Sequence, residues 1–241
     1  MNAAVYIYTG LLDNVVPFWA SKALRGVYRK YGTTKIDYEQ ENIGHEDPKG
    51  KMIQGLMRLY IQLGYYSDQS EFEEPALDYE SLGAFTDFAQ LEFVGIDSTL
   101  VDQKEWVRYL TYWHDAGKVY IPDACYEQQC RVHVAFHDCT SSADAIARYS
   151  EYNSFAASNK IIVVYPETEC WADTWHTPII SWNSTNDDLY WNTKQGLYSR
   201  AIMAIICRVT SGDESTADCP IGATALASIG FSLLLTTTLL Q

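Results

Sequence analysis

Asp13 and His45 carry a carboxylate and an imidazole that could act together in acid–base chemistry. Each follows a short strand-like stretch, residues 5–9 or residues 35–40, and a helical stretch lies between the two. In a catalytic triad the carboxylate orients the imidazole, and the imidazole takes the proton of a nucleophile. The spacing is typical of such an acid and base. The alternative is a surface aspartate in a turn and a solvated histidine in a loop.

A second polar cluster, His137, Asp138 and Cys139, follows the alternating stretch 132–136. Ser141 with Asp144 three residues later is a capping signal for a helix, and residues 161–165 form an apolar run of strand length. Strand, helix and strand in this order predict one unit of a parallel α/β sheet flanked by helices. The polar turn then lies at the carboxyl end of its strand, where α/β folds bind ligands.

Helical spacing further predicts a helix from Pro17 to Gly32 and others at residues 52–63 and 197–209. The apolar face expected for the first helix is Ala20, Ala23, Leu24, Val27 and Tyr31. Residues 106–113 and 118–121 suit antiparallel strands.

The composition excludes some classes of function. The chain has 241 residues, of which 47% are hydrophobic, which is enough for one folded domain. Its formal net charge of −14 argues against a nucleic-acid partner, because a phosphate backbone would be repelled.

The six cysteines favour disulfides over a metal site. No CxxC motif occurs and the histidines are not at ligand spacing, so we expect no metal. Cys125 with Cys130, and Cys139 with Cys170, are the candidate pairs. With a possible glycosylation sequon at Asn183, they indicate an extracellular protein.

The carboxyl terminus differs from the rest of the chain. Residues 1–210 are expected to form one domain, and residues 211–241 a polar spacer with an uncharged apolar tail. This layout is typical of a GPI-attachment signal, and a transmembrane anchor is the alternative. We therefore expect the protein to contact the membrane only through a carboxyl-terminal lipid anchor, at the cell surface. The amino terminus shows no signal peptide, so we expect an incomplete protein.

Four stretches together resemble the esterase/polyhydroxybutyrate (PHB) depolymerase family: VYIYTGLLDNVVP, IGH, CRVHVAFHDCTSSAD and YNSFAASNKIIVVYPETECW. The resemblance implies a circularly permuted α/β-hydrolase fold in which acid and base precede the oxyanion strand. It makes Asp13 and His45 the expected catalytic acid and base. It also implies that the backbone N–H of Cys139 helps to form the oxyanion hole. Trp171 and Trp175 fall where the family has aromatic substrate contacts, with core packing as the alternative.

Two departures from the family pattern bear on activity. The nucleophilic serine of the family lies upstream of the aspartate strand, and no serine elbow occurs in this chain. We therefore expect an amino-terminal truncation. Asp138 also replaces a glycine beside the oxyanion hole, where a carboxylate opposes the charge to be stabilised.

The leading hypothesis is a carboxylic ester hydrolase without a cofactor, acting on a polyester or a small ester and inactive as this chain alone. A non-catalytic surface protein that keeps the fold for binding or adhesion is the second. A carbohydrate-binding module built on the aromatic loop is the third.

Overall fold

The computed structural model describes residues 4–45, 50–73, 86–89, 116–137 and 141–167, and residues 202, 203, 205, 206 and 209. Its strands are β1 (Ala4–Gly10), β2 (Lys35–Glu41), β3 (Thr86–Ala89), β4 (Ala116–Tyr120), β5 (Arg131–Val134) and β6 (Ile161–Tyr165). Its α-helices are α1 (Phe18–Lys30), α2 (Lys51–Leu63), α5 (Ala143–Tyr149) and α6 (Tyr152–Asn159). Two short 3-10 helices, η1 (Gln69–Glu71) and η4 (Asp123–Tyr126), complete the described elements.

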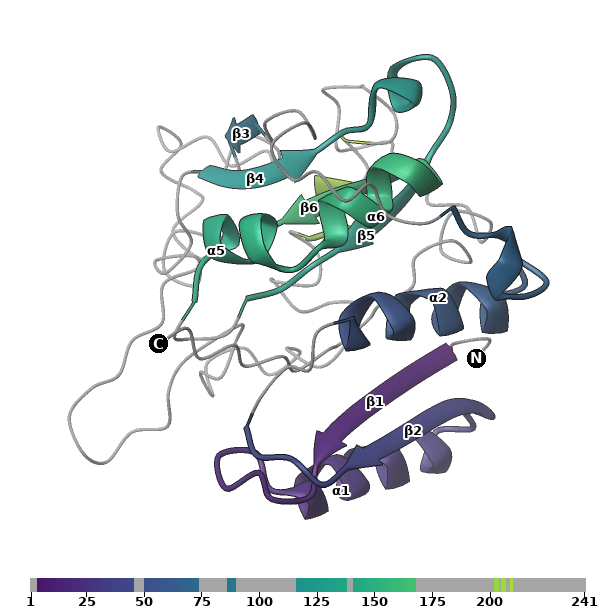
Figure 1. Ribbon diagram of the computed structural model, residues 1–241, viewed down its shortest axis with the longest axis vertical. Coiled ribbons are helices and arrows are strands. Elements are labelled where there is room, and N and C mark those ends of the chain that lie inside the picture. Colours follow the sequence, from purple (N-terminus) through teal and green to yellow (C-terminus); the bar gives the residue numbers. More distant parts are fainter. Residues whose placement is uncertain are drawn as a thin grey trace, which may run out of the picture.

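The strands form two sheets. β1 and β2 pair in parallel, and the second sheet has the order β3-β4-β6-β5. In that sheet β5 and β6 are parallel, whereas β3–β4 and β4–β6 are antiparallel. The strand–helix–strand unit expected from residues 131–171 is therefore present as β5, α5, α6 and β6. In the view of Figure 1 the edges of the two sheets that face each other are β5 and β1.

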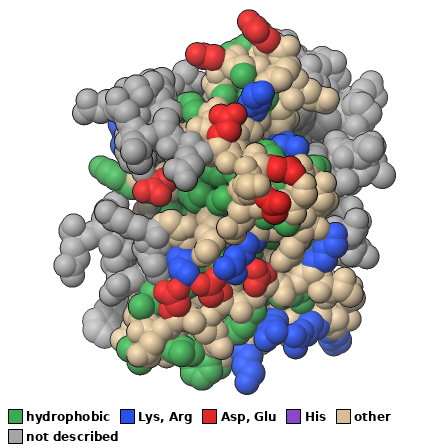
Figure 2. Space-filling view, turned by 45° about the vertical axis from the view of Figure 1, so that its right-hand side comes forward, with side chains coloured by type: hydrophobic (Ala, Val, Ile, Leu, Met, Phe, Trp, Pro, Cys, Tyr) green, Lys and Arg blue, Asp and Glu red, His purple; other side chains and the backbone are tan. Residues whose placement is uncertain are grey.

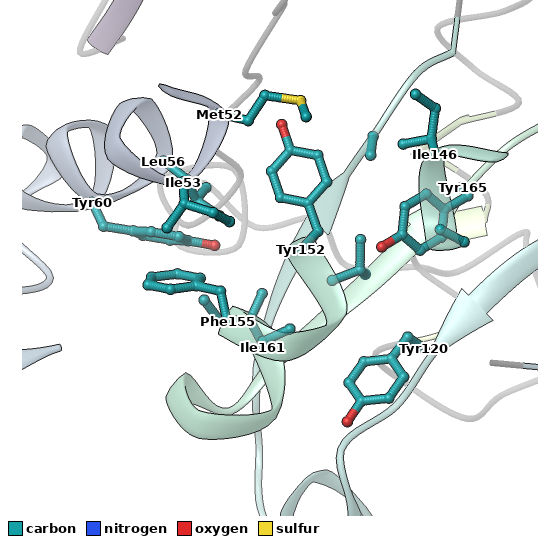
Figure 3. Close-up of a cluster of buried hydrophobic side chains, with 14 of the residues drawn as sticks. Met52, Ile53, Leu56, Tyr60, Tyr120, Ile146, Tyr152, Phe155, Ile161 and Tyr165 are labelled. Atoms are coloured by element: carbon teal, nitrogen blue, oxygen red, sulfur yellow. The ribbon is translucent and has the colours of Figure 1, made fainter. Parts of the chain in front are cut away.

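Helix α2 packs against both sheets. Its Leu59 contacts Ala4 and Tyr6 of β1 in a small buried cluster. Gly55 lets the helix approach, because a Cβ atom there would lie 2.5 Å from the ring of Tyr6. On its other side α2 joins the main core that it shares with α5, α6 and β6 (Figure 3). The α2 members of that core are Met52, Ile53, Leu56 and Tyr60.

The opposite face of the four-stranded sheet is also covered. Ile202, Ile205 and Ile206, all in helical conformation, pack there against the valines of β4, β5 and β6. Their burial agrees with the apolar helix expected around residues 197–209.

Helix α1 has the expected length but buries a different face. The residues turned inward are Ser21, Leu24, Arg25 and Tyr28, whereas Val27 is 48% and Tyr31 69% exposed. The expected apolar face was thus wrong except for Leu24 and, in part, Ala20. The guanidinium of Arg25 stacks on the ring of Tyr38 at 4.9 Å, so an arginine contributes to this packing.

The start of α5 also differs by one residue from the expected cap. Ser142, rather than Ser141, is the N-cap, and its Oγ accepts the N–H of Ala145 at 3.1 Å. Asp144 pairs with Arg148 one turn later instead of completing a capping box.

β2 is the outer strand of its sheet in the described part of the chain, and three acids alternate along it. Asp37, Glu39 and Glu41 form ion pairs with Lys51 and Arg58 of α2. Figure 2 shows this band of acidic and basic side chains across the lower half of the molecule. Charges on a strand edge hinder pairing with other chains. No described helix is both long and apolar enough to cross a bilayer.

Candidate active site

Asp13 and His45, both expected at strand ends, lie side by side in the structure. Nδ1 of His45 is 2.8 Å from Oδ2 of Asp13, and the side chains are 8% and 11% exposed, respectively. The second carboxylate oxygen, Oδ1, accepts the backbone N–H groups of Val15 and Val16, each at 2.8 Å. One oxygen of Asp13 is therefore held by the backbone and the other faces the imidazole.

The pairing of β1 with β2 explains why these residues meet. The two strands are parallel and in register from Ala4–Lys35 to Gly10–Glu41, so their carboxyl ends lie together. Beyond the strands the ladder continues, because the N–H of Leu11 donates to the carbonyl of Glu41 at 2.7 Å. The loops that begin there carry Asp13 and His45.

Gly10 permits the close approach of these two loops. A Cβ atom at this position would lie 2.5 Å from the carbonyl oxygen of Ile43, and it would also collide with that of Gly44. Leu12 donates its N–H to the same carbonyl of Ile43 at 2.9 Å, which ties the loop in place. His45 follows directly, so its position depends on the absence of a side chain at Gly10.

The surroundings keep Asp13 ionised. Burial by itself raises the pKa of Asp13, but the hydrogen bonds from His45, Val16 and Val15 outweigh it, and the pKa lies below its ordinary value. Asp13 is thus ionised over the pH range in which histidines titrate, as the orienting acid of an acid–base pair must be.

Several apolar side chains close to Asp13 in the sequence are exposed to solvent. Among the most exposed large ones in the described residues are Leu12, Val15 and Trp19, at 63%, 60% and 63%. Leu11 and Phe18 are also exposed. Leu11, Leu12 and Val15 belong to the segment between β1 and α1, and Phe18 and Trp19 are the first residues of α1. That segment lies at the lower end of the molecule in Figure 1.

A second cluster lies at the carboxyl ends of β5 and β6. Nε2 of His137, which is 3% exposed, lies 3.1 Å from Oε1 of Glu167. The other carboxylate oxygen of Glu167 accepts the N–H of Ala143, the first residue of α5, at 2.7 Å. Glu167 therefore contacts His137 at the end of β5 and Ala143 at the start of α5. Asp138 and Cys139 themselves are outside the described residues.

The cysteine prediction is confirmed for one pair. Cys125 and Cys130 form a disulfide with a Cα–Cα distance of 5.5 Å. Cys139 and Cys170 lie outside the described residues, as do Trp171, Trp175, Asn183 and the tail 211–241. In the part of the chain that is described, His, Cys, Asp and Glu form no group of three that could hold a metal ion.

Three residues of this region escaped the sequence-based prediction. Gly10 and Glu167 act through contacts with residues far away in the sequence, so no local pattern marks them. His133 is 1% exposed on β5, with its ring 4.7 Å from that of Tyr152. In the sequence it is one residue of the alternating stretch 132–136, and its position between two valines is the local signal of a buried imidazole.

Comparison of the chain with known proteins identifies the enzymes that it resembles. The chain is 25% identical over 250 aligned residues to a poly(3-hydroxybutyrate) depolymerase of Delftia acidovorans, covering 89% of this chain. The chain resembles PHB depolymerases. It spans 44% of the length of that relative. No family model matches the chain.

Two solved PHB depolymerases have the same fold. One is a variant complexed with an R3HB trimer, with a TM-score of 0.56 at 19% identity. The match covers 86% of this chain and 70% of the solved chain. The other is the enzyme of Penicillium funiculosum, with a TM-score of 0.54 at 18% identity. This match covers 85% of this chain and 68% of the solved chain. The α/β-hydrolase-like fold expected from the sequence is thereby confirmed. The strands that lead to Asp13 and His45 precede the strand that leads to His137, which is the permuted order.

Proposed function

We propose that this chain provides the acid–base part of a carboxylic ester hydrolase. The observation that carries the proposal is the hydrogen bond between Asp13 and His45 at the carboxyl ends of two parallel strands. The backbone N–H groups of Val15 and Val16 fix the second oxygen of Asp13, so that its first oxygen stays directed at His45. The resemblance to PHB depolymerases supports the same reaction class.

In this reaction a serine hydroxyl, supplied by polypeptide outside this chain, attacks the ester carbonyl carbon. His45 takes the hydroxyl proton through Nε2 and passes it to the departing alkoxide, which leaves as an alcohol. A water molecule then attacks the acyl-enzyme and His45 takes its proton. His45 returns this proton to the serine oxygen as the acyl–serine bond breaks and the carboxylic acid is released. Asp13 remains ionised throughout and stabilises the imidazolium form of His45.

The negative oxygen of each tetrahedral intermediate would be bound by the backbone N–H of Cys139. One such donor contributes about 3–4 kcal/mol to stabilisation of the transition state. Glu167 supports this role because it ties His137 and Ala143, which flank the turn. Asp138 must then direct its carboxylate away from the oxyanion.

The substrate we propose is a polyester or a small ester. The side chains of Leu12, Val15 and Trp19 are exposed, are close to Asp13 in the sequence, and would suit contact with a water-insoluble chain. Trp171 and Trp175 are proposed as further substrate contacts. No cofactor is needed for this chemistry.

We further propose an extracellular location. The disulfide Cys125–Cys130 is typical of oxidising compartments. Glycosylation at Asn183, a second disulfide Cys139–Cys170 and attachment to the cell surface through a lipid anchor after residue 210 belong to the same proposal.

The test uses the protein purified in its native form from its source. We expect hydrolysis of p-nitrophenyl butyrate and labelling by a serine-reactive fluorophosphonate. His45→Ala should lower kcat by about 10³–10⁴-fold, and Asp13→Asn by a similar factor. The matched control is Asp68→Asn, which removes a carboxylate that caps η1, and it should leave kcat unchanged.

A second candidate function, non-catalytic binding to an apolar surface, is favoured by the same exposed side chains around Asp13. Its signature would be adsorption to PHB films by wild type and His45→Ala alike, without labelling or hydrolysis. Labelling of the native protein by the fluorophosphonate would exclude this alternative.

A further inference from the structure

His45 lies in a segment whose two ends are joined by an ion pair. The segment begins after Glu41, the last residue of β2, and ends before Lys51, the first residue of α2. Nζ of Lys51 is 2.5 Å from Oε1 of Glu41, and it also contacts Oε1 of Glu39. Lys51 therefore ties the start of α2 to the end of β2, on either side of His45 in the sequence.

The two carboxylates that hold Lys51 are themselves fixed by β1. Oε2 of Glu41 accepts the hydroxyl hydrogen of Tyr8 at 3.0 Å, and Oε2 of Glu39 accepts that of Tyr6 at 3.0 Å. Burial raises the pKa of Glu39, but hydrogen bonds from Lys51 and Tyr6 outweigh it and leave the pKa below its ordinary value. The position of Nζ is thus set by the same two strands that lead to the acid–base pair.

α2 begins without the local signals that usually start a helix. Its N-cap is Gly50, which has a φ of 83° and no side chain to cap the helix, and the first turn contains no acid. A serine, threonine, aspartate or asparagine at this position would contribute about 1 kcal/mol. Lys51 also places a positive charge at the end of the helix where the peptide dipoles disfavour one. The start of α2 therefore depends on the carboxylates of β2 more than on its own sequence.

The charges around Lys51 show what its loss would do. Glu39 and Glu41 are two residues apart on the same side of β2, so their negative charges would repel each other without the ammonium group between them. Arg58 is already shared by Asp37 and Glu39. Glu41 would then turn away and release the end of β2, from which the segment with the catalytic base starts.

We propose that Lys51 is a positioning residue that keeps His45 hydrogen-bonded to Asp13. It acts through Glu41 and the start of α2, not by contact with a substrate. The catalytic part of this inference rests on the proposed ester hydrolysis, whereas the hydrogen bond itself can be observed without a substrate.

NMR of the native protein tests the positioning. In wild type, Nδ1–H of His45 should give a downfield signal because it is hydrogen-bonded to Asp13. Lys51→Met keeps an apolar side chain and removes the charge, and we expect this signal to broaden or disappear. Lys51→Arg keeps the charge and should restore it. In Lys51→Met kcat for p-nitrophenyl butyrate should fall about 10–100-fold with KM unchanged, because a small misplacement of a catalytic group is costly.

Lys35→Met is the matched control. Lys35 is the first residue of β2, and its Nζ donates to the carbonyl of Gln62 near the end of α2 at 2.6 Å. It therefore links the same strand and the same helix at the ends opposite to His45. We expect Lys35→Met to lower stability without changing the Nδ1–H signal or kcat.

Glu41→Gln decides the question if Lys51→Met does not fold, because the amide keeps the shape of the side chain and removes the charge that holds Lys51. The same loss of the downfield signal is expected. An unchanged signal in the folded variant of the two would overturn the proposal. An equal loss in Lys35→Met would also overturn it, because it would indicate a general loosening of α2. If the native protein hydrolyses no ester, the proposed function fails, but the Nδ1–H signal still decides the role of Lys51.

Discussion

Gly10 shows how closely the position of His45 depends on one residue outside the acid–base pair. The carbonyl groups of Ile43 and Gly44 occupy the space that a Cβ atom at Gly10 would need. They are backbone atoms at the base of the loop that carries His45, and they can move only if that loop moves. The hydrogen bond of 2.8 Å from His45 to Asp13 is therefore coupled to Gly10.

Gly10→Ala should displace His45 from Asp13 and lower the free energy of unfolding by about 1–3 kcal/mol, because the added methyl group overpacks the contact. The hydrogen-bonded Nδ1–H of His45, observed by NMR, should lose its downfield signal. Gly26→Ala in α1 is the control, since a Cβ atom there meets nothing within 4 Å. It should stabilise the helix by about 0.5–1 kcal/mol. An unchanged Nδ1–H signal in Gly10→Ala would contradict the coupling.

His133 should make stability depend on pH. Burial lowers its pKa from 6.5 to about 4. Between these values the unfolded chain binds a proton that the folded chain does not, so stability falls as the pH falls from 6.5 towards 4. The full effect is about 3 kcal/mol.

The measurement is urea unfolding of wild type and His133→Phe at pH 7, 5.5 and 4. Phenylalanine keeps a ring against Tyr152 but cannot take up a proton. The difference in unfolding free energy between the two proteins should grow towards pH 4. A difference that is independent of pH would show that His133 is protonated equally in both states.

The placement of Asp13 and His45 after two strands could be predicted from the sequence, because residues 5–9 form an apolar run and residues 35–40 alternate. Their neighbours Gly10, Glu167 and His133 could not be assigned in this way. The role of Gly10 arises from the approach of a second loop, and that of Glu167 from two residues on other elements. Such contacts leave no periodic signal.

Among the elements, α1 and α5 show where local patterns are reliable and where they fail. The boundaries of α1 followed from Pro17 and Gly32, whereas α5 begins one residue later than Ser141 predicted. The buried face of α1 was misjudged because the stacking of Arg25 on Tyr38 turns a basic residue inward. For α5 the sequence indicated Ser141 as the cap because Asp144 follows three residues later, whereas Ser142 is the cap in the structure.

The two serines allow a direct test of the cap. Ser142→Ala removes the acceptor for the N–H of Ala145 and should cost about 1 kcal/mol of stability, measured by urea unfolding. Ser141→Ala is the matched control, because Oγ of Ser141 is buried without a hydrogen-bond partner among the described residues. It should be neutral or stabilising. An equal loss in both variants would show that Ser142 does not act as a cap.

At the scale of the whole molecule, the order of elements was predictable and the division into two sheets was not. The resemblance to PHB depolymerases led to the fold class, because its motifs lie at the strand ends. Which strands pair is a long-range property, and β1 and β5 carry the same apolar pattern whether or not a neighbour is present. The space between the sheets therefore had no signature in the sequence.

Gly55→Ala tests how the two sheets are held together. Alanine favours the helix by about 1 kcal/mol, but its Cβ would lie 2.5 Å from the buried ring of Tyr6. We expect the cost of the clash to exceed the gain in helix propensity, so that the net loss of stability is about 1–2 kcal/mol. Chemical denaturation followed by tyrosine and tryptophan fluorescence measures it, and a net gain would show that β1 yields at little cost.

The packing of α2 on both sheets determines how the protein should respond to heating. Asp13 and His45 belong to the two-stranded sheet, whereas His137 and Glu167 belong to the four-stranded sheet, and α2 packs on both. The hydrogen-bond ladders within each sheet do not depend on that packing. On warming, the two groups of polar residues should therefore separate while the far-ultraviolet circular dichroism of each sheet is still intact. Inactivation of the native protein would then occur below its melting temperature.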